Sequence, residues 1–251
     1  MDYSMSDKPG KVQLFHTCIV NEFYPEAGIS VVNVLEHLGL TVEVPRGQTC
    51  CGQPAYNSGY RDDAKKAARH TVELLFKTEG HIIIPSGSCA DMIVHQYPLL
   101  FADEAPILHK VKQVIGRCYE FSQFIVDVLG VTATGAQLNS RAAYHPSCHL
   151  VRGLGVINQP VSLLNGVGGL ETVDFSGQEE CCGFGGTFSV KEPEISGAMM
   201  KKKIDAIEAA GADIIVGCDL GCLMHLEGGL HRKGSPIKVR HIAQILDTGL
   251  R

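Results

Sequence analysis

The chain has 251 residues, of which 45% are apolar and 20% charged, a composition typical of a globular protein large enough to bury a core. A formal net charge of −5 without a basic block argues against nucleic acid or an anionic membrane as a partner. The apolar runs are too short to cross a bilayer and the start, MDYSMSDKPGKVQLF, lacks an apolar signal segment, so we expect a cytoplasmic protein with no transmembrane segment.

The first half of the chain alternates short β-type runs with helical stretches. We expect strands at VQLFHT (12–17), TVEVP (41–45) and HIIIP (81–85), and helices over 26–38 and 61–77. The apolar stripe that runs from Ile29 to Leu38 has helical spacing, and Gly39 suits the end of that helix.

The second half repeats this order. We expect strands at RAAYHPS (141–147), ETVDF (171–175) and ADIIVG (212–217), and helices over 159–167 and 194–210. Pro160 and the glycines that follow it oppose the helix over 159–167. Alternating strands and helices predict an α/β fold in which each half is a Rossmann-like parallel sheet flanked by helices.

Four motifs occur in the same order in both halves, at an offset of roughly 130 residues. FHTCI matches YHPSCHL, CCG matches CCG, HIIIPSGSCADM matches ADIIVGCDLGCLMH, and CYEFSQFIVDVLG matches VRHIAQILDTGL. We interpret the chain as two homologous halves, 10–131 and 141–251, joined by the small, polar linker VTATGAQLNS.

Nine of the ten cysteines follow predicted strands. They are Cys18, Cys50, Cys51, Cys89, Cys148, Cys181, Cys182, Cys218 and Cys222. Because parallel strands all point one way, these cysteines are expected at the carboxyl edge, where such folds bind ligands. In a cytosolic protein so many cysteines indicate metal or redox chemistry. Cys118 aligns with the apolar Val239 and is expected in the core.

Two adjacent pairs, Cys50–Cys51 and Cys181–Cys182, narrow the chemistry. Sets of four thiolates hold either iron–sulfur clusters or zinc. Neighbouring side chains diverge, which suits different irons of one cluster better than a single ion. A disulfide within each pair is the alternative, but its ring is strained and the cytosol is reducing. Gly52 and Gly183 predict a positive φ or a close backbone approach.

Histidines, glycines and lysines close to these cysteines are interpreted without a direct role as ligands. Four histidines, His16, His145, His149 and His225, have no histidine counterpart in the other half, so we interpret them as polar residues that line the site or hydrogen-bond a sulfur. The glycines at 183, 185 and 186 do not match a dinucleotide fingerprint. Lys201–Lys203 predicts a solvated helix face, with a docking patch for an acidic redox partner as the alternative.

The motifs TCCGQPAYNSGY, PSGSCADM and ECCGFGGTFSVK resemble the lactate utilisation protein A family, whose duplicated cysteine-rich (CCG) domain is related to the cysteine-rich subunit of heterodisulfide reductase. The resemblance implies one or two iron–sulfur clusters of the 4Fe-4S type. It also implies lactate utilisation proteins B and C as partners in the oxidation of L-lactate to pyruvate. Carried over by position, the ligands are Cys18, Cys50, Cys51 and Cys89 in one half and Cys148, Cys181, Cys182 and Cys222 in the other.

The chain departs from the five-cysteine pattern that, in the reductase, holds a noncubane four-iron cluster. Cys218 and Cys222 are spaced one residue wider than that family's CxxC, and Ser86 stands where a first-half cysteine would fall. Cys218 is therefore a fifth candidate for cluster binding in the second half. The first half, with four thiols, would hold an ordinary four-iron cluster or none.

No flavin or nicotinamide fingerprint accompanies the cysteines. We therefore predict an iron–sulfur electron-transfer subunit of an oxidoreductase complex, without a self-contained active site. The alternatives are a disulfide reductase-like protein that works through a cluster or dithiol, and a structural zinc-binding scaffold.

Overall fold

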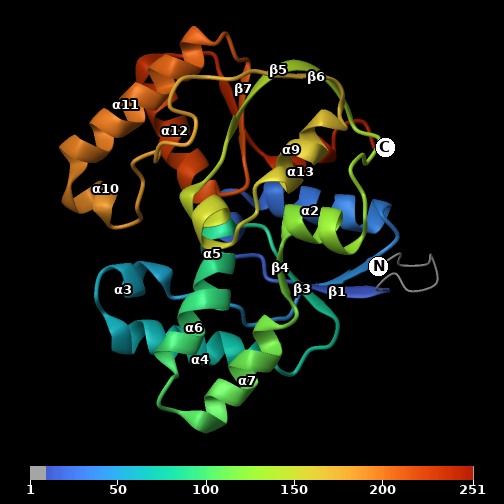
Figure 1. Ribbon diagram of the computed structural model, residues 1–251, viewed down its shortest axis with the longest axis vertical. Coiled ribbons are helices and arrows are strands. Elements are labelled where there is room, and N and C mark those ends of the chain that lie inside the picture. Colours follow the sequence, from blue (N-terminus) through green and yellow to red (C-terminus); the bar gives the residue numbers. More distant parts are fainter. Residues whose placement is uncertain (1–9, 251) are drawn as a thin grey trace.

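The computed structural model describes residues 10–250, which form two four-stranded parallel sheets (Figure 1). The first sheet has the order β2-β1-β3-β4, made of β1 (Lys11–Leu14), β2 (Thr41–Glu43), β3 (His81–Ile84) and β4 (Cys118–Glu120). The second has the order β6-β5-β7-β8, made of β5 (Gln137–His145), β6 (Gly168–Thr172), β7 (Ile214–Gly217) and β8 (Lys238–His241). The predicted α/β fold with two repeated halves is confirmed.

Helices cover both faces of each sheet (Figure 1). In the first half they are α1 (Cys18–Phe23), α2 (Pro25–His37), α3 (Gln53–Asn57), α4 (Arg61–Leu75), α5 (Gly87–Asp91), α6 (Tyr97–Leu100), α7 (Ala105–Ile115) and α8 (Phe121–Gln123), with π-helical turns η2 (Met92–Gln96) and η3 (Phe124–Val128). In the second they are η4 (His149–Gly153), α9 (Asn158–Asn165), α10 (Phe188–Lys191), α11 (Pro193–Ala209), α12 (Leu220–Lys233) and α13 (Ile242–Leu246).

The main elements lie where the sequence predicts them, with two differences. The strand expected at 171–175 is shifted toward the N-terminus, and β5 begins at Gln137, inside the predicted linker. Each sheet also has a fourth strand, β4 or β8, that the three-strand pattern did not include. These strands are very short and pass directly into helices through capping boxes at Glu120–Gln123 and His241–Gln244, so they leave little periodic signal.

The two halves share one hydrophobic core. Leu14 and Val34 from the first half are buried in the same cluster as Tyr144 and Leu246 from the second. Polar contacts also join α2 to α13, since Ser30 Oγ donates a hydrogen bond of 3.0 Å to Asp247. Separating the halves would expose this apolar surface to water, so the halves are held in a fixed mutual arrangement.

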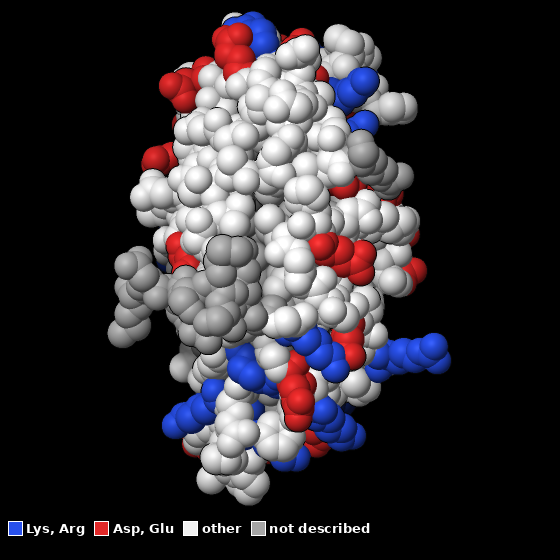
Figure 2. Space-filling view, turned by 90° about the vertical axis from the view of Figure 1, so that its right-hand side faces the viewer, with Lys and Arg blue, Asp and Glu red and all other residues white. Residues whose placement is uncertain are grey.

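One face of the molecule carries charges of both signs. On the face shown in Figure 2, Lys and Arg at the first-half end stand beside Asp and Glu, and much of the rest is uncharged. Among residues 10–250, no helix is both long and apolar enough to span a membrane.

Glu120, at the end of β4, is a buried carboxyl with a predictable effect on stability. It is 1% exposed, and its Oε2 accepts the backbone N–H groups of Ser122 and Gln123, while Oε1 has no partner. Burial raises the pKa of Glu120 to about 7. Its folded pKa is thus higher than its unfolded one, and the stability it contributes at low pH is lost as the pH rises to about 7 and above.

Glu120→Gln is therefore expected to weaken the pH dependence of folding. Relative to wild type, the variant should gain on the order of 2 kcal/mol in unfolding free energy between pH 5 and pH 8, because the amide never ionises. Urea unfolding of metal-free, reduced protein at both pH values measures this gain. Glu73→Gln, at an exposed position on α4, is the matched control. Parallel pH profiles for wild type and Glu120→Gln would contradict the assignment.

Candidate functional site

Four thiols of the first half meet beyond the carboxyl edge of its sheet. Cys18 begins α1 after β1, Cys50 and Cys51 lie in the loop after β2, and Cys89 lies in α5 after β3. The Sγ atoms of Cys51 and Cys89 are 3.5 Å apart. The thiols of Cys18 and Cys51 both act on that of Cys50 and lower its pKa. The topology thus joins residues from three separate loops into one set.

The second half repeats this arrangement. Cys148 precedes η4, Cys181 and Cys182 follow β6, and Cys222 lies in α12. Cys148 and Cys182 act on the pKa of Cys181 in the same way, and the Sγ atoms of Cys182 and Cys222 lie within 4.8 Å of each other. We call the two groups the first and second cysteine sets. All ten cysteines of the chain are free.

A glycine follows each adjacent pair and shapes the loop around it. Gly52 and Gly183 have φ of 86° and 92°, which confirms the predicted positive φ. The N–H of Gly52 points at the sulfur of Cys50, and the N–H of Gly183 at that of Cys181, each over 3.4 Å. A Cβ at Gly183 would lie 2.6 Å from the carbonyl oxygen of Ser196, so the loop packs tightly on α11.

One thiol in each set, Cys50 or Cys181, has a lowered pKa. Hydrogen bonds from Cys18 and Cys51 hold the pKa of Cys50 well below its usual range. Hydrogen bonds from Cys148 and Cys182 do the same for the pKa of Cys181. Because the thiolate is the form that binds metal and attacks electrophiles, the lowered pKa favours the reactive form of one sulfur in each set.

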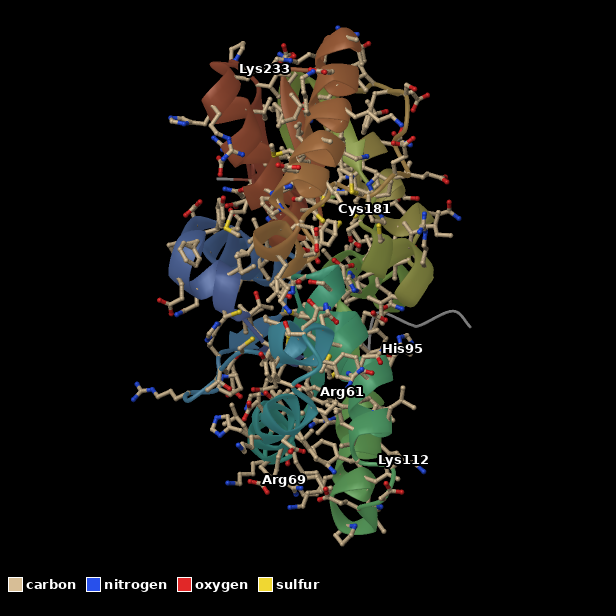
Figure 3. All side chains as sticks on the ribbon, turned by 90° about the vertical axis from the view of Figure 1, so that its left-hand side faces the viewer. Arg61, Arg69, His95, Lys112, Cys181 and Lys233 are labelled. Atoms are coloured by element: carbon tan, nitrogen blue, oxygen red, sulfur yellow. The ribbon has the colours of Figure 1, made fainter. Side chains whose placement is uncertain are left out.

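Both sets open onto one cavity between the halves. It has a volume of about 190 Å³ and is lined by all eight thiols of the two sets. The N-termini of α5 and α12 meet in its lining, where the N–H of Ser88 donates to Asp219 Oδ2 over 2.7 Å. In Figure 3, Cys181 lies on the side of the second half that faces the first half, whereas Lys233 lies at the far end.

Cys218 and Cys118 lie apart from both sets. Cys218 is fully buried in the shared core, beside Tyr144 and Ser122, and does not line the cavity. The reason is the extra residue: Ser86 caps α5 and Asp219 caps α12, so Cys218 precedes the cap. Cys118 is also buried, and its Sγ donates to the carbonyl of Val114 over 3.3 Å.

The four histidines have different surroundings. His149 lines the cavity, His16 Nδ1 lies 3.2 Å from the carbonyl of Thr17, and His225 Nε2 lies 3.2 Å from Ser196 Oγ. His145 is buried, and neither ring nitrogen has a hydrogen-bond partner. Its ring lies within 4.8 Å of the sulfurs of Cys182 and Cys222.

One expectation about the lysines is wrong. Lys201 and Lys202 are exposed and form ion pairs with Asp205 and Glu180, as a solvated face should. Lys203 is only 3% exposed and points into the second half. It occupies the inward stripe of α11 with Met200, Ile204 and Ile207, which helical spacing could have revealed.

Comparisons with known proteins agree with this geometry. The pattern of the cysteine-rich domain, CCG, matches residues 12–94 and 142–227. The chain is thus a duplicated cysteine-rich-domain protein, with one domain in each half. It is 48% identical over 238 residues to lactate utilization protein A 1 of Bacillus mycoides, covering 94% of this chain and 96% of the relative. It is 47% identical to lactate utilization protein A of Bacillus subtilis, covering 95% and 99%. The chain belongs to the lactate utilization protein A family.

A solved structure supports the fold alone. The crystal structure of a hypothetical protein from Helicobacter pylori matches with a TM-score of 0.67 at 14% sequence identity. The match covers 96% of this chain and 49% of that one.

Proposed function

We propose that the two cysteine sets hold iron–sulfur clusters and that the chain carries electrons in the oxidation of L-lactate to pyruvate. The observation that supports this most is the pair of four-thiol sets facing one cavity. The lactate role rests on the relatives, which are named for lactate utilization. By the same resemblance, the partners would be lactate utilisation proteins B and C.

The residues of each set fit a cluster. Four thiolates are a common ligand set for a four-iron cluster. A single zinc ion needs no space beyond its ligands, whereas the cavity of about 190 Å³ beside the thiols exceeds by more than tenfold the ~15 Å³ that one water requires. The first set would bind through Cys18, Cys50, Cys51 and Cys89, and the second through Cys148, Cys181, Cys182 and Cys222.

A bound cluster would supply one-electron redox chemistry, and the chain supplies its environment. Cys51 and Cys182 are 2% and 1% exposed, so each set reaches from a dry interior to the open cavity. The outer thiols, Cys18 and Cys148, are partly exposed, which leaves a route for a redox partner to approach.

A complementation experiment tests the role in lactate oxidation. A strain that lacks this gene and any other lactate oxidase is expected to lose growth on L-lactate as sole carbon source. Wild type and Cys118→Ser should restore growth, whereas the double variant Cys51→Ser/Cys182→Ser should not. Growth of the deletion strain at the wild-type rate would overturn the proposal.

A second candidate function, thiol–disulfide chemistry, is favoured by the lowered pKa values of Cys50 and Cys181, which both face the cavity. This function predicts that iron-free protein turns over a small disulfide in the presence of an external thiol reductant. It also predicts that the double variant Cys50→Ser/Cys181→Ser abolishes the turnover. Turnover no faster than that of the reductant alone would exclude it.

A further inference from the structure

The two cysteine sets are arranged alike, but the residues behind them differ. In the first sheet Leu14 pairs with Ile83, and in the second Tyr144 pairs with Val216. Phe15 and His145, which follow Leu14 and Tyr144, therefore occupy equivalent places. One set is backed by an apolar ring and the other by an imidazole.

His145 lies beside the second set with both ring nitrogens free to bond a group held there. It is 1% exposed, both ring nitrogens lack partners, and its ring lies within 4.8 Å of the sulfurs of Cys182 and Cys222. A buried imidazole without any partner is costly, so its N–H calls for an acceptor that a sulfur ligand can provide. Phe15, which is fully buried, offers no donor.

The two halves also differ in the helices on which the loops of Gly52 and Gly183 pack. The glycine loops pack on equivalent points of two helices, because a Cβ at Gly52 would meet the Ala64 carbonyl and one at Gly183 the Ser196 carbonyl. Counting the same number of residues onward from Ala64 and Ser196 reaches Thr71 and Lys203. Both are buried, but only Lys203 carries a charge.

The Lys203 side chain is hydrogen-bonded inside the second half. Its Nζ donates to the carbonyls of Gly177 and Gln178 over 2.9 and 3.1 Å and lies 5.2 Å from the ring centroid of Phe175. Burial lowers the pKa of Lys203, and negative charge on Cys182 and Cys222 acts in the opposite direction, so Lys203 and the second set interact electrostatically.

Asp219 is a charge that opposes Lys203, and at Cys222 it acts more strongly than Lys203 does. It accepts the N–H groups of both Ser88 and Gly221, so it lies beside Cys89 as well as beside Cys222. In the first set, the charges that act on the Cys18 and Cys51 thiols are those of other cysteines. The innermost thiols of the two sets are equally buried, so solvent exposure does not separate them.

We propose that Lys203 and His145 make the second cysteine set the centre of higher reduction potential, where an electron that enters the protein settles first. Reduction adds negative charge, and both a nearby cation and an N–H donor to sulfur stabilise the reduced form. An electron shared between two loaded sets leaves the first set oxidised and the second reduced. This inference rests on the proposed function, since it requires bound clusters.

A redox titration of anaerobically purified holoprotein, followed by EPR, tests the inference. Cys51→Ser and Cys182→Ser, each lacking one set, assign the two signals. We expect the second-set signal to be reduced first. Lys203→Met should lower the preference of the electron for the second set at least tenfold, which is a shift of about 59 mV for one electron. Lys201→Met, with an exposed lysine on the same helix, should change neither midpoint.

Exchanging the backing residues tests the same point without relying on Lys203. His145→Phe should lower the second midpoint, and Phe15→His should raise the first. Equal midpoints, earlier reduction of the first set, or midpoints unmoved by both Lys203→Met and His145→Phe would overturn the inference. If only the second set holds iron, the inference is tested by whether Lys203→Met and His145→Phe lower the midpoint of that set. Wild-type protein free of iron would refute the proposed function itself.

Discussion

Cys182→Ser is expected to lose the iron of the second set and to keep that of the first. The reason is that Cys182 is a buried thiol of the second set, and its Sγ lies within 4.8 Å of that of Cys222. A serine hydroxyl stays protonated at neutral pH and cannot replace a thiolate ligand. Cys51→Ser should produce the mirror result. Iron analysis of anaerobically purified variants measures both losses, each about half of the wild-type content if both sets are loaded.

Two cysteines outside the sets provide matched controls. Cys118→Ser and Cys218→Ser each replace a buried thiol, but neither cysteine lines the cavity. Both variants should keep the wild-type iron content, provided that they fold, which circular dichroism verifies. Loss of iron in Cys218→Ser to the same extent as in Cys182→Ser would contradict the ligand assignment and return Cys218 to the site.

Gly183→Ala is expected to destabilise the protein strongly. A φ of 92° strains any residue with a Cβ, and the new Cβ would lie 2.6 Å from the Ser196 carbonyl. Strain alone costs about 1–2 kcal/mol, and the backbone overlap should bring the total to roughly 4 kcal/mol. The loop would move away from α11 and carry Cys181 and Cys182 with it, so iron should also be lost from the second set.

Gly39→Ala separates strain from crowding. Gly39 has a φ of 86°, but a Cβ there would meet nothing within 4 Å. Only the strain remains, so the expected cost is about 1–2 kcal/mol with the iron content unchanged. Urea unfolding of the metal-free proteins compares the two costs. Equal destabilisation by Gly183→Ala and Gly39→Ala would show that the close contact with Ser196 does not matter.

The sequence predicted the position of the eight thiols because that position depends only on parallel topology. Once Cys18, Cys50 and Cys89 follow three parallel strands, they must come to the same edge of the sheet. The repeat then transfers the argument to the second half. How the two edges face each other depends on the shared core between the halves, which motif spacing does not encode.

Single buried residues were harder to predict for a different reason. Lys203 follows two exposed lysines, and only its phase on α11 distinguishes it from them. His145 has an apolar counterpart, Phe15, so the repeat gave no sign of its role. Cys218 resembles a ligand in the sequence because it is close to Cys222. In the structure α12 begins after the cap at Asp219, and Cys218, which precedes the cap, is buried in the core.

The metal content of the anaerobically purified wild-type chain tests the central claim most directly. The proposed function predicts a brown protein that contains iron and acid-labile sulfide in equal amounts, with roughly four irons in each loaded cysteine set. It also predicts an EPR signal that appears or disappears on reduction. A colourless protein that contains zinc and no iron would contradict it, and would make the two cysteine sets structural zinc sites.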